Sequence, residues 1–309
     1  MRTPLSEGDG LTAVLCGAQS HGMGVAPPPS NVEADQRPGL NRLAQLLARA
    51  TPAVMGVLNV TPDSFSDGGR FIEPPNALEQ ARRMISEGAD ILDIGAESTR
   101  PYGGAKAVAI DEEMRRLAPI LPAAVALGVP VSIDTMKASV AEWALAAGAA
   151  VINDVWGLQR DGDMAAVAAK HGVPVIIMHN REHADPAIDI MADISAFFAR
   201  SLAIAESAGI ARDQIVLDPG IGFGKTPQQS LIAIARLREL KSFGLPLLVG
   251  ASRKRFIASV SPAPPDQRLG GSIAAHVLAM ANGAAIIRTH DVAETVQAVR
   301  VTAAIASMR

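Results

Sequence analysis

The sequence predicts a single (β/α)8 barrel preceded by a mostly flexible N-terminal extension. Three observations support this: eight short apolar runs that finish on polar residues, alanine-rich helical stretches between them, and a glycine closing each such stretch. Strands that are apolar on both faces and alternate with helices indicate a parallel sheet, because parallel strands need crossover connections. Eight units favour closure into a barrel, and an open, doubly wound sheet is the main alternative.

Residues 1–50 are the predicted extension ahead of the barrel. Up to about residue 40 they are rich in glycine, proline and serine and have no sustained apolar period, so we expect a mostly flexible segment. Leu43, Leu46 and Leu47 then have the spacing of a short helix over residues 41–49, which could cover the bottom of the barrel. The barrel is expected over residues 51–309.

The eight expected strands lie between residues 53 and 290. In order they are AVMGVLN, DILDIG, VPVSIDT, AVIND, VPVIIMH, QIVLDPG, LPLLVGASR and AAIIRTH. The stretches between them close at Gly88, Gly128, Gly148, Gly172, Gly209, Gly244 and Gly283. Glycine readily takes the left-handed conformation that stops a helix, so these positions are the predicted helix ends.

Two of the intervening helices can be described further. Asn76 is expected to cap the helix that follows the first strand, because its side chain can accept from free backbone N–H groups. Pro119 and Pro122 interrupt the segment after Asp111, which should therefore break into two helices.

Composition excludes several classes of protein. A hydrophobic content of 49%, a charged content of 19% and a net charge of −3 describe a globular protein with one large core. With no basic excess and few aromatic residues, nucleic-acid binding is not expected. No apolar run is long enough for a membrane span, and the start lacks the layout of a secretory signal. The single cysteine, Cys16, cannot form an intramolecular disulfide, so we expect a cytoplasmic protein.

Hydrogen-bonding residues stand at the carboxyl end of nearly every expected strand. They are Asn59, Asp93, Asp134, Asn153 with Asp154, Met178 with His179, Asp218, Ser252 to Lys254, and Arg288 with His290. Any one of them could simply begin a turn. The carboxyl ends of barrel strands meet at one mouth, however, and barrel enzymes hold their active sites there. The sequence therefore predicts a site at this mouth.

Two connections at the same mouth are unusually long. VTPDSFSDGGRFIEPP follows Asn59 and carries Phe65, and GAESTRPYGGAKA follows Asp93 and carries Arg100. Most connections of this kind have about two to six residues. Two long polar loops on one face suggest closure over a substrate.

The glycine-rich stretch DPGIGFGK, residues 218–225, directly follows a strand. Its spacing matches neither the dinucleotide fingerprint nor the P-loop. We interpret its glycines as letting the backbone pass close to a flat ligand, with Phe223 packed nearby. The histidines do not have the spacing of a zinc site, and His171 is expected to be only the last residue of a helix.

Two basic groups occur at neighbouring strand ends late in the chain. Arg253-Lys254-Arg255 follows the seventh strand, and Arg288 and His290 follow the eighth. Barrels commonly hold phosphate at this place, so the two groups predict a cationic pocket. A solvated basic face is the alternative for the triplet.

The order of several strings carries a family resemblance. MGVLNVTPDSFSDGG, DIGAESTRP, SIDT, INDV, IMHN, LDPGIGFGK, GASRKRFI and RTHDV occur in this order, and from about residue 53 onward the chain resembles the dihydropteroate synthases. The resemblance implies a TIM barrel and a transferase of folate biosynthesis. Its reaction would condense 6-hydroxymethyl-7,8-dihydropterin pyrophosphate with 4-aminobenzoate to give 7,8-dihydropteroate and pyrophosphate, by a dissociative, SN1-like route. The resemblance also implies Mg2+, a homodimer, and sulfonamides competing for the aminobenzoate position.

The resemblance assigns residues to each part of the substrate site. The pterin would be held by Asp134, Asn153, Asp218, Lys254, Met178, Phe223 and Val155, and the diphosphate by Asn59, Thr99, Arg288 and His290. The aminobenzoate would be held by Phe65, Ser66, Thr99, Arg100, Pro101, Ser252 and Lys254, and the Mg2+ by Asn59. Lys254, Arg288, His290, Asp67 and Arg100 would be the catalytic residues. The residue types suit these roles, because carboxylates accept from paired N–H groups and cations stabilise a departing diphosphate.

The chain departs from the family pattern in the second long loop. Ala96 stands where the family has a glycine, and Tyr102 is an additional aromatic residue. Two alternatives therefore stay open: a paralogue that binds pterin without turnover, and a pterin-dependent methyltransferase. The methyltransferase has no need of TPDSFSDGG, Arg100 or the pair of Arg288 and His290, all of which are present.

Overall fold

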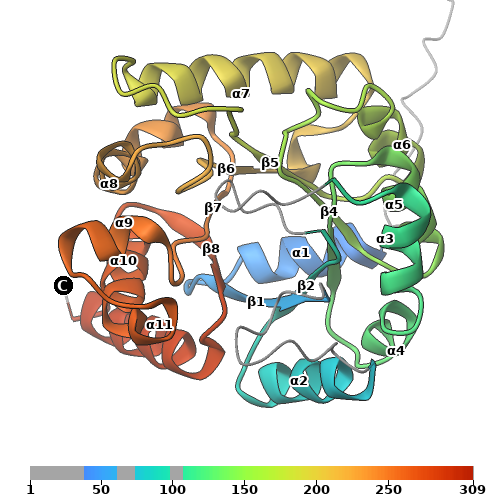
Figure 1. The fold of residues 1–309 in the computed structure, drawn as a ribbon, viewed down its shortest axis with the longest axis horizontal. Helices are drawn as coiled ribbons and strands as arrows, with labels where there is room; N and C mark the ends of the chain where they lie inside the picture. Colours follow the sequence, from blue (N-terminus) through green and yellow to red (C-terminus); the bar gives the residue numbers. More distant parts are fainter. Residues whose placement is uncertain (1–37, 61–73, 98–106, 309) are drawn as a thin grey trace, which may run out of the picture. The chain divides into compact units, whose positions relative to one another are not determined.

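The computed structural model describes residues 38–60, 74–97 and 107–308. In this part of the chain eight parallel strands form a closed barrel in sequence order, with the last strand paired to the first (Figure 1). The strands are β1 (Ala53–Asn59), β2 (Ile91–Gly95), β3 (Val131–Asp134), β4 (Val151–Asp154), β5 (Val175–Met178), β6 (Ile215–Asp218), β7 (Leu247–Val249) and β8 (Ala284–Thr289). The predicted barrel is confirmed, and the open sheet is excluded.

Helices surround the strands on the outside (Figure 1). The α-helices are α1 (Pro38–Leu47), α2 (Pro74–Ser86), α3 (Ile110–Leu117), α4 (Leu121–Val125), α5 (Ala138–Ala146), α6 (Met164–His171), α7 (Ile190–Ser207), α8 (Pro227–Ala235), α9 (Arg255–Val260), α10 (Leu269–Ala281) and α11 (Val292–Ala306). The part of the chain that the structure describes also has three short 3-10 helices, η2 (Arg212–Gln214), η3 (Leu237–Phe243) and η4 (Pro265–Gln267). None of the described helices is both long and apolar enough to cross a membrane.

The predicted helix boundaries are mostly confirmed. All seven closing glycines have positive φ angles, and the segment after Asp111 breaks between α3 and α4 as the two prolines predict. His171 is the last residue of α6, as expected. The prediction that Asn76 caps a helix is wrong, because α2 already begins at Pro74. Proline fixes the helical φ angle and its missing N–H costs nothing in a first turn, so the two prolines before Asn76 start the helix.

An apolar layer fills the lower part of the barrel. One buried cluster joins Leu43 of α1 to inward-facing strand residues, namely Ala53, Met55, Ile91, Val151, Ile176, Val216, Leu248 and Ile286. Figure 1 shows α1 crossing the centre of the ring of strands. The short helix therefore covers the bottom of the barrel as predicted, although it spans Pro38–Leu47 rather than residues 41–49.

The strand repeat places a second, more polar layer above the first. Side chains two residues apart on a strand point to the same side. Six residues each follow a member of the apolar layer by two positions: Asp93, Asn153, Met178, Asp218, Gly250 and Arg288. Alternation along the strands thus directs the five side chains among them into the barrel at its carboxyl-terminal mouth, and Gly250, which has no side chain, faces the same way just after β7.

Candidate active site

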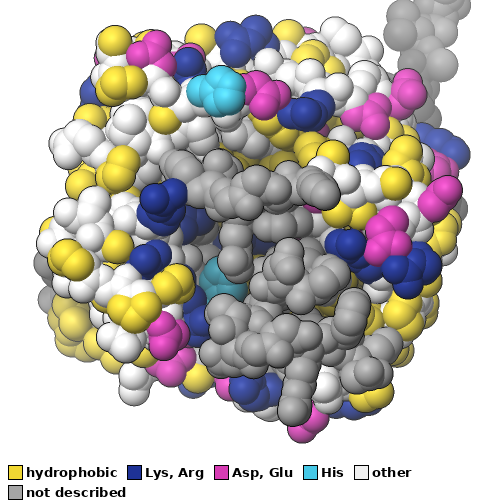
Figure 2. Space-filling model, viewed as in Figure 1, with side chains coloured by type: hydrophobic (Ala, Val, Ile, Leu, Met, Phe, Trp, Pro, Cys, Tyr) yellow, Lys and Arg dark blue, Asp and Glu magenta, His cyan; other side chains and the backbone are white. Residues whose placement is uncertain are grey.

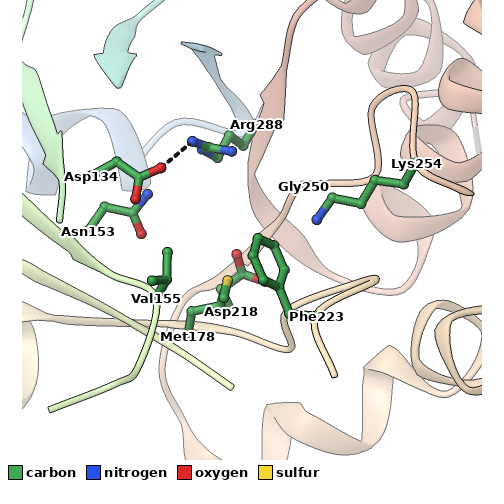
Figure 3. A pocket seen from close by; sticks show the side chains of 9 residues that line it. All are labelled: Asp134, Asn153, Val155, Met178, Asp218, Phe223, Gly250, Lys254 and Arg288. Carbon is green, nitrogen blue, oxygen red and sulfur yellow. Dashed lines mark hydrogen bonds and ion pairs between the residues drawn. The ribbon is translucent and has the colours of Figure 1, made fainter. Parts of the chain in front are cut away.

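A pocket lies in the carboxyl-terminal mouth of the barrel (Figure 3). It is lined by Asp134, Asn153, Val155, Met178, Asp218, Phe223, Gly250, Lys254 and Arg288. These include every residue predicted for the pterin, together with Arg288, which was predicted for the diphosphate. Gly250 was not predicted, although it stands two residues after Leu248 in β7 and the strand repeat alone points it inward.

Arg288 forms a buried ion-pair network with two aspartates. Its Nη2 donates to Oδ2 of Asp134 at 2.7 Å, the contact drawn in Figure 3. Its Nε donates to Oδ2 of Asp93 at 2.6 Å. Asp93 is fully buried in the middle of β2. It was predicted among the polar residues near the strand ends but was given no role at the site.

Burial and charge move the ionisation of this network in opposite directions. Burial raises the pKa of Asp134 to about 7, although the nearby guanidinium of Arg288 opposes the shift. Burial also disfavours a charged Arg288, but the carboxylates of Asp93 and Asp134 outweigh it and raise the pKa of the guanidinium. Arg288 therefore stays charged, while Asp134 titrates near neutral pH.

Asp218 and Lys254 approach the pocket from β6 and from the segment after β7. Asp218 Oδ1 accepts from the backbone N–H of Gly220 at 2.7 Å. Lys254 Nζ donates to the carbonyl of Ile221 and lies 4.5 Å from the centre of the Phe223 ring. Burial lowers the pKa of Lys254 to about 8 and raises that of Asp218, with the opposite charge of each partner counteracting the shift.

The three glycines of residues 218–225 lie against different parts of the molecule. A Cβ on Gly220 would lie 2.0 Å from the carbonyl oxygen of His179, and one on Gly224 would lie 2.4 Å from Cβ of Arg181. Both have positive φ angles and let the loop pack against the chain after β5, which corrects our interpretation that they approach a ligand. Gly222 lies next to Lys254 at the pocket, and Phe223 lines the pocket as predicted.

Lys225 anchors this loop, and sequence reasoning missed its role. Its side chain is buried, and Nζ donates to the carbonyls of Gly220 at 2.8 Å and Phe223 at 3.1 Å. Nζ also lies 2.6 Å from Nδ1 of His179. The sequence signal for this anchoring role is a lysine directly after the glycine run. The comparison with the P-loop pattern does not bring out that role.

The predicted cationic pocket is wrong for two members of the basic triplet. Arg253 has a positive φ angle of 58° and forms an ion pair with Asp291, and its backbone N–H donates to Ser272 at 2.9 Å. Arg255 is exposed at the first residue of α9. Only Lys254 lines the pocket, because the left-handed turn at Arg253 sends consecutive side chains in different directions.

His290 and Ser252 contact each other, and each follows a residue that lines the pocket by two positions, Arg288 and Gly250 respectively. The Nδ1 of His290 lies 3.0 Å from the Ser252 hydroxyl, which also accepts from the backbone N–H of His290 at 3.2 Å. Asn59 is partly buried at the end of β1. Among the residues that the structure describes, no three His, Cys, Asp or Glu side chains are grouped to hold a metal ion.

The remaining predicted site residues fall in the two long loops. Phe65, Ser66, Asp67, Thr99, Arg100 and Pro101 lie outside the described residues, and so does Tyr102. The residues that line the pocket come from the strands and from the segments after β4, β6 and β7.

Known proteins share this sequence and this barrel. The chain matches the family of pterin binding enzymes over residues 55–290. A dihydropteroate synthase of Bacillus subtilis (strain 168) is 48% identical over 240 residues, which cover 77% of this chain and 83% of the relative. The chain belongs to the dihydropteroate synthase family. Like the relatives in this family, it is a transferase.

Solved dihydropteroate synthases have the same fold. One from Clostridium difficile, determined in the presence of pteroic acid, has 47% sequence identity and a TM-score of 0.79, and the match covers 83% of this chain and 97% of that one. One from Xanthomonas albilineans, determined with 4-aminobenzoic acid, has 44% identity and a TM-score of 0.80, covering 84% and 94% of the two chains.

Proposed function

We propose that the chain condenses 6-hydroxymethyl-7,8-dihydropterin pyrophosphate with 4-aminobenzoate, forming 7,8-dihydropteroate and releasing pyrophosphate. The observation that carries this proposal is the convergence of Asp134, Asn153, Asp218 and Lys254 on one pocket beside the cationic Arg288. The pteroic acid and 4-aminobenzoic acid in the solved relatives support the same substrates for this chain.

The pterin would be recognised by its edge. Its 2-amino-pyrimidinone edge presents adjacent N–H donors, and ionised carboxylates are acceptors only. Asp134 Oδ1 is buried and has no hydrogen-bond partner among the described residues, so a ligand donor would relieve the cost of burying it. Met178, Val155 and Phe223 would contact the faces of the ring.

Arg288 and His290 would stabilise the departing diphosphate. In a dissociative, SN1-like reaction, breaking the bond from carbon to oxygen leaves positive charge on the pterin methylene and negative charge on the leaving group. The pterin ring can spread the positive charge, and cations fixed beside the diphosphate lower the energy of the negative charge as it develops. The aminobenzoate nitrogen then attacks the carbon and gives up one proton to the released pyrophosphate or to water, and no covalent protein nucleophile takes part.

Asn59 suits a Mg2+ that is held mainly by the diphosphate. Magnesium uses oxygen ligands, keeps several waters and commonly takes only one or two groups from the protein. The amide oxygen of Asn59, at the end of β1 in the barrel mouth, offers a ligand of this kind. When bound, the ion would neutralise part of the charge on the leaving diphosphate.

Ser252 and Lys254 would form the described part of the aminobenzoate site. Lys254 belongs to the same short segment after β7 as Ser252 and also lines the pocket, so it can border both substrates. A Yersinia pestis dihydropteroate synthase has been solved in a sulfonamide drug complex, which supports sulfonamide competition at this site. Phe65, Ser66, Asp67, Thr99, Arg100 and Pro101 would complete it from the long loops.

We also infer that the chain acts as a cytoplasmic homodimer. Leu278 of α10 and Val301 and Ile305 of α11 are 58%, 53% and 59% exposed. The two helices are neighbours, and hydrophobic side chains gather where they lie, at the lower left of Figure 2. Exposed apolar surface on adjacent helices favours a symmetric contact between two copies. Sedimentation of L278E/V301E should give a monomer, whereas an unchanged mass would place the contact elsewhere.

An assay of the purified protein tests the reaction. Incubation with the pterin pyrophosphate, 4-aminobenzoate and Mg2+ should release pyrophosphate and form 7,8-dihydropteroate in equal amounts. Pterin binding without any product would instead favour a paralogue that binds pterin without turnover. Omission of 4-aminobenzoate is the control, since it separates condensation from hydrolysis of the pyrophosphate ester.

A further inference from the structure

Asp93 lies beneath the pocket and connects two of its walls. It is fully buried in β2 and is not among the residues that line the pocket. Its Oδ2 accepts two hydrogen bonds, one from Arg288 Nε at 2.6 Å and one from Asn153 Nδ2 at 3.1 Å. These partners follow it by 195 and 60 positions in the sequence, so they meet only because the barrel closes.

The contact with Asp93 determines which way the amide of Asn153 points. The two ends of an asparagine amide have almost the same shape, so neighbouring groups decide their orientation. Oδ2 of Asp93 accepts this hydrogen bond, so the NH2 group of Asn153 is turned toward Asp93. Figure 3 shows the result: the amide nitrogen faces the side of Arg288, and the amide oxygen faces the pocket.

The same carboxylate oxygen holds the guanidinium of Arg288. A buried positive charge needs a charged acceptor, and binding through Nε fixes the plane of the group. With Nε on Asp93 and Nη2 on Asp134, Arg288 is held at two points along one edge. Its position beside the pocket therefore depends on a residue that is not itself part of the pocket lining.

We propose that Asp93 is a positioning residue that aims the amide oxygen of Asn153 at the pterin and fixes the guanidinium of Arg288. The proposal deepens the function proposed above and rests on it. Asp93 makes position 153 an acceptor, like the carboxylates of Asp134 and Asp218. The pocket thereby selects a heterocycle whose edge carries N–H donors.

The variant Asp93→Asn tests the proposal because it keeps the shape of the side chain. The new amide can offer either a donor or an acceptor to Asn153, so the orientation of Asn153 is no longer fixed, and Arg288 loses a charged partner. Loss of hydrogen bonds to charged groups should weaken the binding of a free pterin on the order of ten- to hundredfold. Titration calorimetry with 6-hydroxymethylpterin measures this directly, whether or not the condensation is observed.

The double variant D93N/N153D separates the effect of Asp93 on the orientation of Asn153 from its effect on the position of Arg288. In this double variant the amide introduced at position 93 can donate to the carboxylate introduced at position 153, and the second oxygen of that carboxylate faces the pocket as an acceptor. We expect the pterin Kd to return to within about threefold of the original chain, which is well under 1.4 kcal/mol. The value of kcat should stay low, because the carboxylate that held Arg288 Nε is now at position 153.

Asp90→Asn is the matched control. Asp90 also pairs with an arginine through both carboxylate oxygens, Arg49 at 2.8 and 2.7 Å, but it lies just before β2 at the other end of the barrel. This variant should leave both the pterin Kd and kcat within about twofold, a change well below one hydrogen bond to a charged group. If Asp90→Asn and Asp93→Asn lost pterin affinity and kcat equally, Asp93 would act only by stabilising the fold.

Three results would overturn the proposal. These are an unchanged pterin Kd in D93N, no recovery of pterin binding in the double variant, and full recovery of kcat in the double variant. If D93N does not fold, D93N/N153D is compared with the original chain directly, and a weakened pterin Kd there counts against the proposal. Absence of product with the original chain would contradict the proposed reaction, and the binding titrations would still decide the role of Asp93.

Discussion

Lys225 Nζ lies 2.6 Å from Nδ1 of His179, and both side chains are buried. On its other side, His179 Nε2 lies 3.0 Å from Oδ2 of Asp193. The carboxylate of Asp193 accepts, so the neutral ring carries its proton on Nε2, and its Nδ1 is left to accept from Lys225. This chain of contacts connects α7 to the loop that carries Phe223, and so supports one wall of the pocket.

Lys225→Met should loosen that wall. The carbonyls of Gly220 and Phe223 would lose a buried donor, which should lower the free energy of unfolding by about 1–3 kcal/mol. Pterin affinity should fall as well, because Phe223 is no longer held. Urea unfolding and pterin titration measure the two effects. Lys170→Met, at an exposed lysine paired with Glu142, is the control and should change the stability by less than about 0.5 kcal/mol.

The His179 ring predicts how stability depends on pH. Burial lowers the pKa of His179 to about 4, so between about pH 4 and 6.5 the unfolded chain binds a proton that the folded chain does not. The contribution of His179 is present above about pH 6.5 and is lost by about 1.4 kcal/mol per pH unit as the pH falls toward 4. Raised pKa values at Asp134 and Asp154 act in the opposite direction. The difference in unfolding free energy between the original chain and H179Q isolates the effect, and a difference that does not vary with pH would contradict it.

Asp134 predicts a pH dependence of pterin binding. Its pKa of about 7 means that the carboxylate is ionised only above neutral pH, and the ionised form is the one that accepts from a pterin N–H. Affinity should therefore fall about tenfold per pH unit below 7. Arg288→Gln removes a positive charge that lowers the pKa of Asp134, so the profile should move to higher pH. Asp134→Asn should show no such step, and a profile that persists in this variant would assign the titration to another group.

Arg253 and Arg288 should behave differently toward diphosphate. Arg253 is paired with Asp291 away from the pocket lining, whereas Arg288 lines it. Arg288→Gln should weaken the binding of the pterin pyrophosphate much more than that of free pterin when both are measured at a pH above the shifted Asp134 titration of this variant. Arg253→Gln should lower the free energy of unfolding by about 1 kcal/mol and leave the ratio of the two affinities unchanged. If Arg253→Gln instead lost affinity for diphosphate selectively, Arg253 would belong to the diphosphate site, as the sequence predicted and the structure contradicts.

The ends of the expected strands and the family resemblance predicted most of the described site, and the two-residue repeat of the strands explains why these side chains meet. Asn153, Asp218 and Arg288 are directed into the barrel by the apolar residues that precede them. The same repeat directs Asp93 inward, but its importance depends on Arg288, which the sequence does not reveal as a neighbour. The repeat ends at the turn after β7, where the positive φ angle of Arg253 decides which basic residue meets the pocket. The anchoring role of Lys225 could not be predicted for a similar reason. Its partners are backbone carbonyls, and the conformation of the turn after β6 decides where they lie.

The central claim is that one mouth of the barrel holds a pterin by its edge and the diphosphate by its cations. A crystal structure of the protein with the pterin pyrophosphate tests it most directly. We predict that the 2-amino-pyrimidinone edge faces Asp134, Asn153 and Asp218, and that the diphosphate lies against Arg288 and His290. Density for the ligand outside this mouth, or a diphosphate remote from both cations, would contradict the account.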